Sequence, residues 1–167
     1  PVIDNVDLRR IRVFKDLSDA ELAGIADLAS FKSLAANTQI VLDRDVPAGV
    51  FFIVEGEGAV LAIAPSGQMA TMATFASGDG FGVHAAMLNH TYGHHVSRLH
   101  CTAPTTLLIL KRADFRSFVE QSRALCLACF AYVSAQQAQL ATRFYELSTL
   151  DVRGRLVAEL VRLTQRA

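Results

Sequence analysis

The sequence predicts an α+β protein in which a short helix precedes a sandwich or barrel of short strands and a long helical segment follows it. A serine and a glutamate three residues apart, Ser18 and Glu21, form the pattern of a helix-opening capping box. Between about Phe31 and Leu110, short apolar runs alternate with glycine-containing turns. After Lys111, apolar residues recur at helical spacing to the end of the chain.

Composition fits one domain, or one domain with an appendage. The chain has 167 residues, of which 51% are hydrophobic, and its 16 basic and 16 acidic residues give a formal net charge of +0. This content suffices for a core, while the balanced charge gives no overall electrostatic footprint for nucleic acid.

Three features indicate a cytoplasmic protein. The three cysteines, Cys101, Cys126 and Cys129, do not make a secreted disulfide framework. No signal peptide opens the chain, and no apolar run has the length of a membrane span. The helical spacing of apolar residues is still continuing at Leu163, close to the last residue, so we expect the chain to be a fragment of a longer protein.

The apolar spacing after Ser18 predicts a short amphipathic helix over Leu22, Ile25, Ala26 and Leu28. Five apolar runs predict strands, with a hairpin turn at 65–67. These runs are Gln39–Leu42, Val50–Val54, Gly58–Ile63, Met69–Phe75 and Leu107–Leu110.

Spacings of 3, 4, 3, 4 and 3 in the long helical segment are typical of a coiled-coil seam. The seam residues are Phe130, Val133, Gln137, Leu140, Phe144 and Leu147. This period favours a helical partner over packing on the chain's own strands. Asp151 is the expected N-cap of a further helix whose apolar face holds Val152, Leu156, Leu160 and Leu163.

All five histidines lie between positions 84 and 100. Imidazole binds metals and titrates near neutral pH, so the cluster predicts a site. The alternative is a solvated polar loop in which the histidines bind nothing.

Four segments in order resemble the catabolite-activator and fumarate-nitrate-regulator (Crp/Fnr) family of bacterial transcription regulators. They are Phe14–Leu22 (opening helix), Pro47–Gly56 (second and third strands), Gly78–Gly82 (start of the phosphate cassette) and Leu150–Leu156 (hinge). The resemblance implies a cyclic-nucleotide-binding-type β jelly roll with short flanking helices, a long dimerisation helix and a homodimer. It implies a sensing domain over residues 1–120, a dimerisation helix over 121–150, and a hinge with a first helix over 151–167. DNA would then be bound only through the missing C-terminal domain.

The resemblance places the nucleotide contacts on residues that fit them poorly. After the cassette glycine, here Gly82, nucleotide-binding members have a glutamate for the ribose, and this chain has Val83. The position of the phosphate-binding arginine falls on His95 and that of its small neighbour on Val96. Arg98 is expected on the opposite face of the strand from His95. We therefore expect weak binding of cyclic AMP.

One branch of the family, a haem-containing carbon-monoxide sensor, departs similarly. Its iron-ligating histidine matches His84, and its apolar cover over the haem corresponds to Leu140, Ala141 and Phe144. Its cysteine ligand is replaced by Gly82, and its terminal proline ligand corresponds to Pro1. His94 or His95 would serve as second ligand or distal group. The cofactor is therefore open, with haem the candidate and a gas or other small effector the expected ligand.

Other interpretations stay open at this point. They are a cyclic-nucleotide regulator with a divergent cassette, a cupin-like metal-binding protein, and a dimer module without an effector. Against a cupin, His94 and His95 are adjacent and would face opposite sides of a strand. No nucleophile with a neighbouring base is visible, so we expect no enzyme. Cys126 and Cys129 form a C-x-x-C on a predicted helix, which indicates packing.

Overall fold

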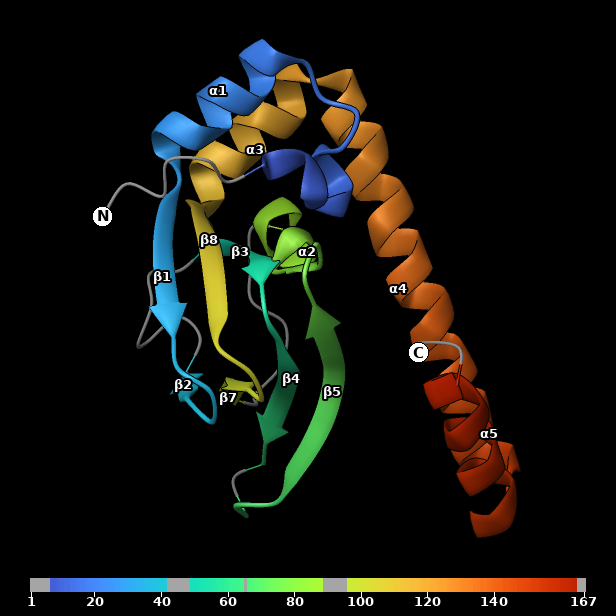
Figure 1. Cartoon of the computed structure of the whole chain (residues 1–167). Helices are drawn as coiled ribbons and strands as arrows, with labels where there is room; N and C mark the ends of the chain where they lie inside the picture. Colours follow the sequence, from blue (N-terminus) through green and yellow to red (C-terminus); the bar gives the residue numbers. More distant parts are fainter. Residues whose placement is uncertain (1–6, 42–48, 65, 89–95, 165–167) are drawn as a thin grey trace. The chain divides into compact units, whose positions relative to one another are not determined.

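A computed structural model describes residues 7–41, 49–64, 66–88 and 96–164 (Figure 1). By compactness the chain divides into two units, residues 1–129 and 130–167, each of which is described by itself. This division differs from the predicted boundaries at 120 and 150. Those boundaries separate functional regions rather than compact units, so they stay a prediction.

The first unit begins with two 3₁₀ turns, η1 (Leu8–Arg10) and η2 (Arg12–Phe14), and the helix α1 (Asp19–Leu28). The predicted capping box is present: the backbone N–H of Glu21 donates to Ser18 Oγ at 3.3 Å, and that of Ser18 donates to Glu21 Oε2 at 2.8 Å. On the predicted apolar face of α1 only Ile25 is fully buried, and Leu28 is exposed.

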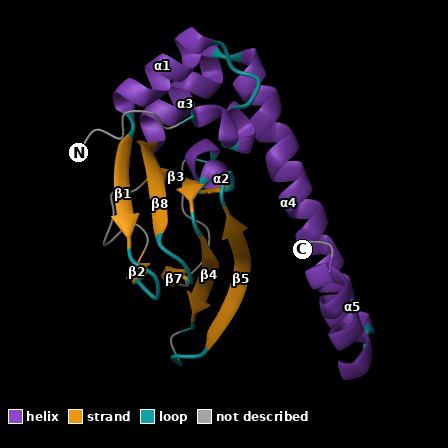
Figure 2. Ribbon diagram, viewed as in Figure 1, coloured by secondary structure: helices purple, strands orange, loops and turns teal. Residues whose placement is uncertain are grey.

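Eight strands form two four-stranded antiparallel sheets, which confirms the jelly-roll class (Figure 2). The sheets have the strand orders β1-β8-β3-β6 and β2-β7-β4-β5. The strands are β1 (Ser30–Leu34), β2 (Gln39–Val41), β3 (Gly49–Glu55), β4 (Glu57–Ile63), β5 (Met69–Ala76), β6 (Gly80–Phe81), β7 (Val96–Cys101) and β8 (Thr105–Lys111).

The core lies between the sheets. It consists of Leu34, Ile40, Phe51, Ile53, Phe75, Leu99, Cys101, Leu107 and Ile109. The sheet that contains β3 and β8 is buried on its other face as well, where Phe52 packs between Phe14 (ring centroids 4.6 Å apart) and Phe115 (5.8 Å). Burial on both faces explains why β3 and β8 read as continuous apolar runs and not as alternating ones.

Two further helices of this unit are α2 (Val83–Met87) and α3 (Arg112–Gln121). Together with η1, η2 and α1, helix α3 gathers at one end of the strands (Figure 1). The sequence predicted neither α2 nor the strands β1 and β6, because each is short and lacks a periodic apolar pattern.

The long helix α4 (Arg123–Thr149) runs through both units, and α5 (Val152–Thr164) follows it. The N-cap prediction is confirmed, since the N–H of Gly154 donates to Asp151 Oδ1 at 2.8 Å. The expectation that nothing could span a membrane was too strict. Among the described residues, α4 is long and apolar enough to cross a membrane, judged by length and composition alone. Residues 124–142 include glutamines and a serine, but none of them is charged. One such helix is weak evidence for a span.

Candidate functional site

The chain approaches α2 through a tight glycine turn. Gly82 has φ +85° and is the N-cap of α2; a Cβ there would lie 2.8 Å from the carbonyl oxygen of Gly49. A Cβ on Gly80 would lie 2.6 Å from the ring of Phe52. Both the left-handed φ and the close approach to β3 exclude a larger residue at position 82. The cysteine ligand of the carbon-monoxide sensor therefore has no room in this backbone.

Helix α2 has a buried face and an exposed face. Val83 (2% exposed) and Ala86 (4%) are buried in the body of the first unit. His84 is exposed, and Met87 (37%) and Leu88 (43%) lie three and four residues after it, which places all three on one side of the helical turn. The structure thus presents an imidazole beside two exposed apolar side chains.

Val83 is the residue at which the resemblance to nucleotide-binding members predicts the ribose contact. Its buried isopropyl group offers no hydrogen-bond acceptor. Phe81, two residues earlier, stacks on Phe51 with ring centroids 5.2 Å apart and packs against the core. At positions 81 and 83 the cassette therefore offers only apolar side chains.

Helix α3 fixes the end of α2. Arg116 Nη2 donates to the carbonyl oxygen of Met87 at 2.8 Å, which satisfies one of the last carbonyls of α2. The same side chain lies 3.9 Å from Glu120, one turn further along α3. The helix that carries His84 is thereby attached to the helix that leads into α4.

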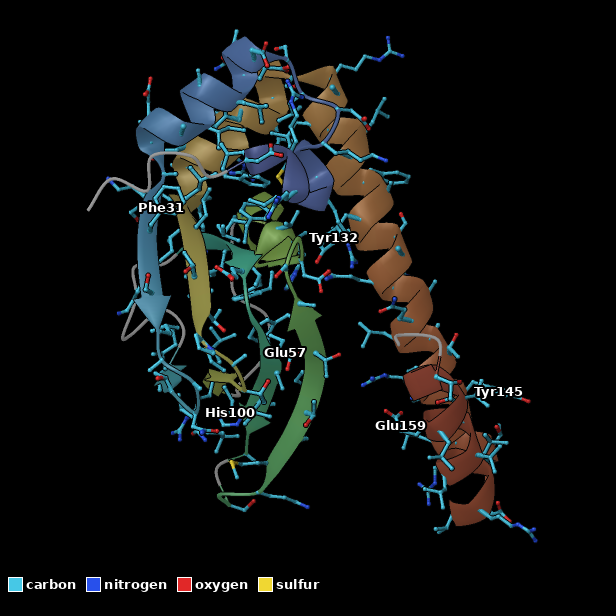
Figure 3. All side chains as sticks on the ribbon, viewed as in Figure 1. Phe31, Glu57, His100, Tyr132, Tyr145 and Glu159 are labelled. Atoms are coloured by element: carbon cyan, nitrogen blue, oxygen red, sulfur yellow. The ribbon has the colours of Figure 1, made fainter. Side chains whose placement is uncertain are left out.

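On β7 the side chains alternate as the strand period requires. Leu99 and Cys101 are fully buried in the core, whereas Arg98 lies on the outer face and donates to Gln39 Oε1 at 3.1 Å. His100 shares that outer face, at the end of the roll where Glu57 also lies (Figure 3). Arg98 is therefore not aimed into the roll, as a phosphate-binding residue would have to be.

Several predicted site residues lie outside the described residues. They include His94, His95 and His90, and the side chain of Val96 at the start of β7 is not described either. Within the described ranges, no three His, Cys, Asp or Glu side chains come together as a metal-binding group. The cupin-like alternative thus finds no centre in the part of the chain that the structure describes.

Two of the cysteine thiols are held protonated. Burial raises the pKa of Cys101, and burial together with the neighbouring Cys126 raises the pKa of Cys129 to about 12. Cys126 is exposed. A thiol with so high a pKa is a poor nucleophile and metal ligand, which favours packing as the role of Cys129.

The α3–α4 junction is joined to α1. Ser122 Oγ accepts a hydrogen bond from the N–H of Leu125 at 3.1 Å and so caps α4. Its hydroxyl also hydrogen-bonds to Glu21; this bond, with those from Ser18, lowers the pKa of Glu21 to about 2.

The predicted seam of α4 is largely open in the single chain. Phe130 (72%), Phe144 (73%), Leu140 and Leu147 are exposed, Gln137 is exposed and Val133 is half-buried. Leu140, Ala141 and Phe144 belong to the second unit, whereas α2 belongs to the first. Their predicted role as a cover for a cofactor stays a prediction.

Sequence reasoning missed Met87, Leu88 and Arg116 as parts of this site. Met87 and Leu88 lie three and four residues after His84. A predicted helix over 83–87 would have placed them on the same face as His84. The structure also has a shallow pocket of about 370 Å³ that includes Ser33, Glu55 and Thr106, and no predicted site residue lines it.

Comparisons with known proteins agree with this fold. The family model "Cyclic nucleotide-binding domain" matches residues 31–122, more than half of the chain. No curated protein sequence matches the chain.

Three solved structures illustrate the likeness. The catabolite activator protein of Thermus thermophilus is 18% identical, with a TM-score of 0.64 over 82% of this chain and 63% of that one. A Crp/Fnr-family transcriptional regulator from Eubacterium rectale is 14% identical, with a TM-score of 0.71 over 92% and 70%. A doubly substituted CooA from Carboxydothermus hydrogenoformans is 19% identical, with a TM-score of 0.64 over 93% and 98%.

The chain spans less than two thirds of the Thermus protein but nearly all of the CooA structure. At these identities the structures show a shared fold, and the family model shows membership. The chain belongs to the cyclic nucleotide-binding domain family, in the fold of the Crp/Fnr regulators.

Proposed function

We propose that this chain is the effector-sensing and dimerisation module of a Crp/Fnr-type transcription regulator, and that it senses through a haem ligated by His84. The observation that carries the proposal is the exposed face of α2, where His84 stands beside Met87 and Leu88. An exposed imidazole next to apolar side chains suits a flat, largely apolar metal cofactor.

The residues of the cassette argue against the usual cyclic nucleotide. The ribose contact is replaced by the buried Val83, and Arg98 of β7 is bonded to Gln39 on the outer face of its sheet. Each lost polar contact to a charged or hydroxyl group costs roughly 1.5–3 kcal/mol. Two such losses would take a micromolar site into the millimolar range or beyond.

The described residues around α2 could supply one iron ligand and an apolar edge for haem. When bound, haem supplies an iron atom that takes a diatomic gas as a further ligand. His84 would hold the iron, Met87 and Leu88 would exclude water from one edge, and Arg116 would keep α2 in place through its bond to Met87. Gly82 leaves no room for a second ligand from the turn. His94 and His95 remain the candidates for that position.

Dimerisation through α4 is the other half of the proposal. Four of the six seam positions are large, exposed apolar residues. A continuous row of exposed apolar side chains is typical of an interaction surface and is rare on a soluble monomer. A homodimer would bury them, with Gln137 fixing the register. The chain covers 63% of the Thermus protein and 70% of the Eubacterium regulator, so part of each of those proteins has no counterpart among the residues compared.

Reconstitution with hemin tests the haem assignment. The parent chain should bind one hemin per chain with a sharp Soret band, and His84→Ala should shift the band and weaken binding at least about tenfold, as loss of an axial ligand does. His100→Ala is the matched control, because His100 lies on the outer face of β7. An unchanged band in His84→Ala would remove His84 from the site, and a parent that binds no hemin would remove haem.

A further inference from the structure

The last helix is attached to α4 by one ion pair. Within the second unit α5 turns back on the end of α4 (Figure 1). Arg162 Nη2 lies 2.6 Å from Glu146 Oε2, and the two side chains are 23% and 19% exposed. Arg162 also pairs with Glu159 of its own helix, which projects from α5 in Figure 3.

Little apolar surface supports this contact. The half-buried side of α5 consists of Gly154, Ala158 and Arg162, spaced four residues apart. Of its larger apolar residues, those whose side chains are described are exposed by half or more: Val152, Leu156, Val157, Leu160 and Val161. Among the α5 residues whose side chains are described, none is fully buried. A glycine and an alanine bury too little area to hold a helix in place by themselves.

The connection between the two helices is short. Helix α4 ends at Thr149 and α5 begins at Val152, so only Leu150 and Asp151 join them. Asp151 caps α5 through the N–H of Gly154, and this bond moves with α5 because both residues belong to its first turn.

We propose that the Glu146–Arg162 ion pair is a latch that keeps α5 folded back on α4, and that α5 exchanges between docked and released positions when the pair opens. The latch is independent of what the first unit binds. Because its partners are partly exposed, salt weakens it, and an acidic or basic partner that takes up Arg162 or Glu146 releases α5.

Hydrogen exchange of the α5 amides in the intact chain tests the latch. A released helix of this length is marginally stable in water, so undocking should appear as faster exchange along α5. Glu146→Gln removes the carboxylate and keeps the side-chain size. It should speed exchange over residues 155–162 by about twofold to fivefold, the change expected for loss of a partly exposed ion pair.

Glu159→Gln is the matched control. It makes the same substitution on the other partner of Arg162 and leaves the bond between the helices intact, so α5 should exchange nearly as in the parent. Salt at 1 M, where the Debye length falls to about 3 Å, should bring the parent toward Glu146→Gln and leave that variant unchanged. Equal exchange in the parent and Glu146→Gln, or equal acceleration by both substitutions, would overturn the latch.

Discussion

Arg116 on α3 donates a hydrogen bond of 2.8 Å to the carbonyl oxygen of Met87, the last residue of α2. The bond joins two helices that are separate in sequence. The position of α2, and of the face that carries His84, therefore depends on α3. A single residue, Ser122, separates α3 from α4 and caps α4, so the helix that holds α2 leads directly into the start of the long helix. The packing of the buried Val83 and Ala86 also holds the short α2 in place.

Arg116→Met should therefore loosen α2 without unfolding the roll. A hydrogen bond from a partly exposed guanidinium contributes about 1 kcal/mol, so we expect hemin binding to weaken roughly fivefold. Hydrogen exchange should rise at Leu88, whose N–H bonds to the carbonyl of His84. Glu120→Gln, which removes the carboxylate 3.9 Å from Arg116 and leaves the bond to Met87 in place, is the control. If it weakens hemin binding equally, the bond to Met87 is not the cause.

Cyclic AMP and cyclic GMP should bind with dissociation constants well above the micromolar range. Val83 cannot accept the ribose hydroxyl, and Arg98 is engaged with Gln39 on the outer face. Titration calorimetry on the chain measures this directly. Val83→Glu, which restores an acceptor, should improve binding if the rest of the cassette is competent. Micromolar binding by the parent would show that His95 or another residue near the cassette takes the phosphate.

The class of fold could be predicted from sequence because its signals were local. The capping box at Ser18, the apolar runs at β3 and β8 and the cap at Asp151 each act within a few residues, and the structure confirms them. Helix α2 could not be predicted, since five residues beginning at a left-handed glycine carry no helical period. The role of Arg116 depends on two segments that meet only in the folded chain, which is why sequence position gave no hint of it.

Leu140→Glu should convert a dimer of this chain into monomers. Leu140 is an exposed apolar residue at a seam position, so a symmetric dimer would bring two carboxylates together in an apolar contact. Sedimentation velocity measures the change. Gln139→Glu adds the same charge at the neighbouring exposed position, off the seam, and should leave the dimer intact. A monomeric parent, or a dimeric Leu140→Glu, would show that the open face of α4 has another purpose.

Glu21 should make the stability of the first unit depend on pH in the acid range. Hydrogen bonds from Ser122 and Ser18 favour its charged form and lower its pKa from the usual 4.5 to about 2 in the folded chain. A carboxyl whose pKa is depressed on folding stabilises the folded state fully above pH 4.5, and this contribution is lost as the pH falls toward 2. Glu21→Gln should therefore lower the free energy of unfolding at pH 7, and the gap between variant and parent should close as the pH falls from 4.5 to 2. Urea unfolding at several pH values measures the gap.

Ser122→Ala supplies the second arm of a double-mutant cycle: in its background the effect of Glu21→Gln should shrink, because the bond between α1 and the α3–α4 junction is already gone. A gap that stays constant across this range would mean that Glu21 stabilises the fold only as a neutral capping group.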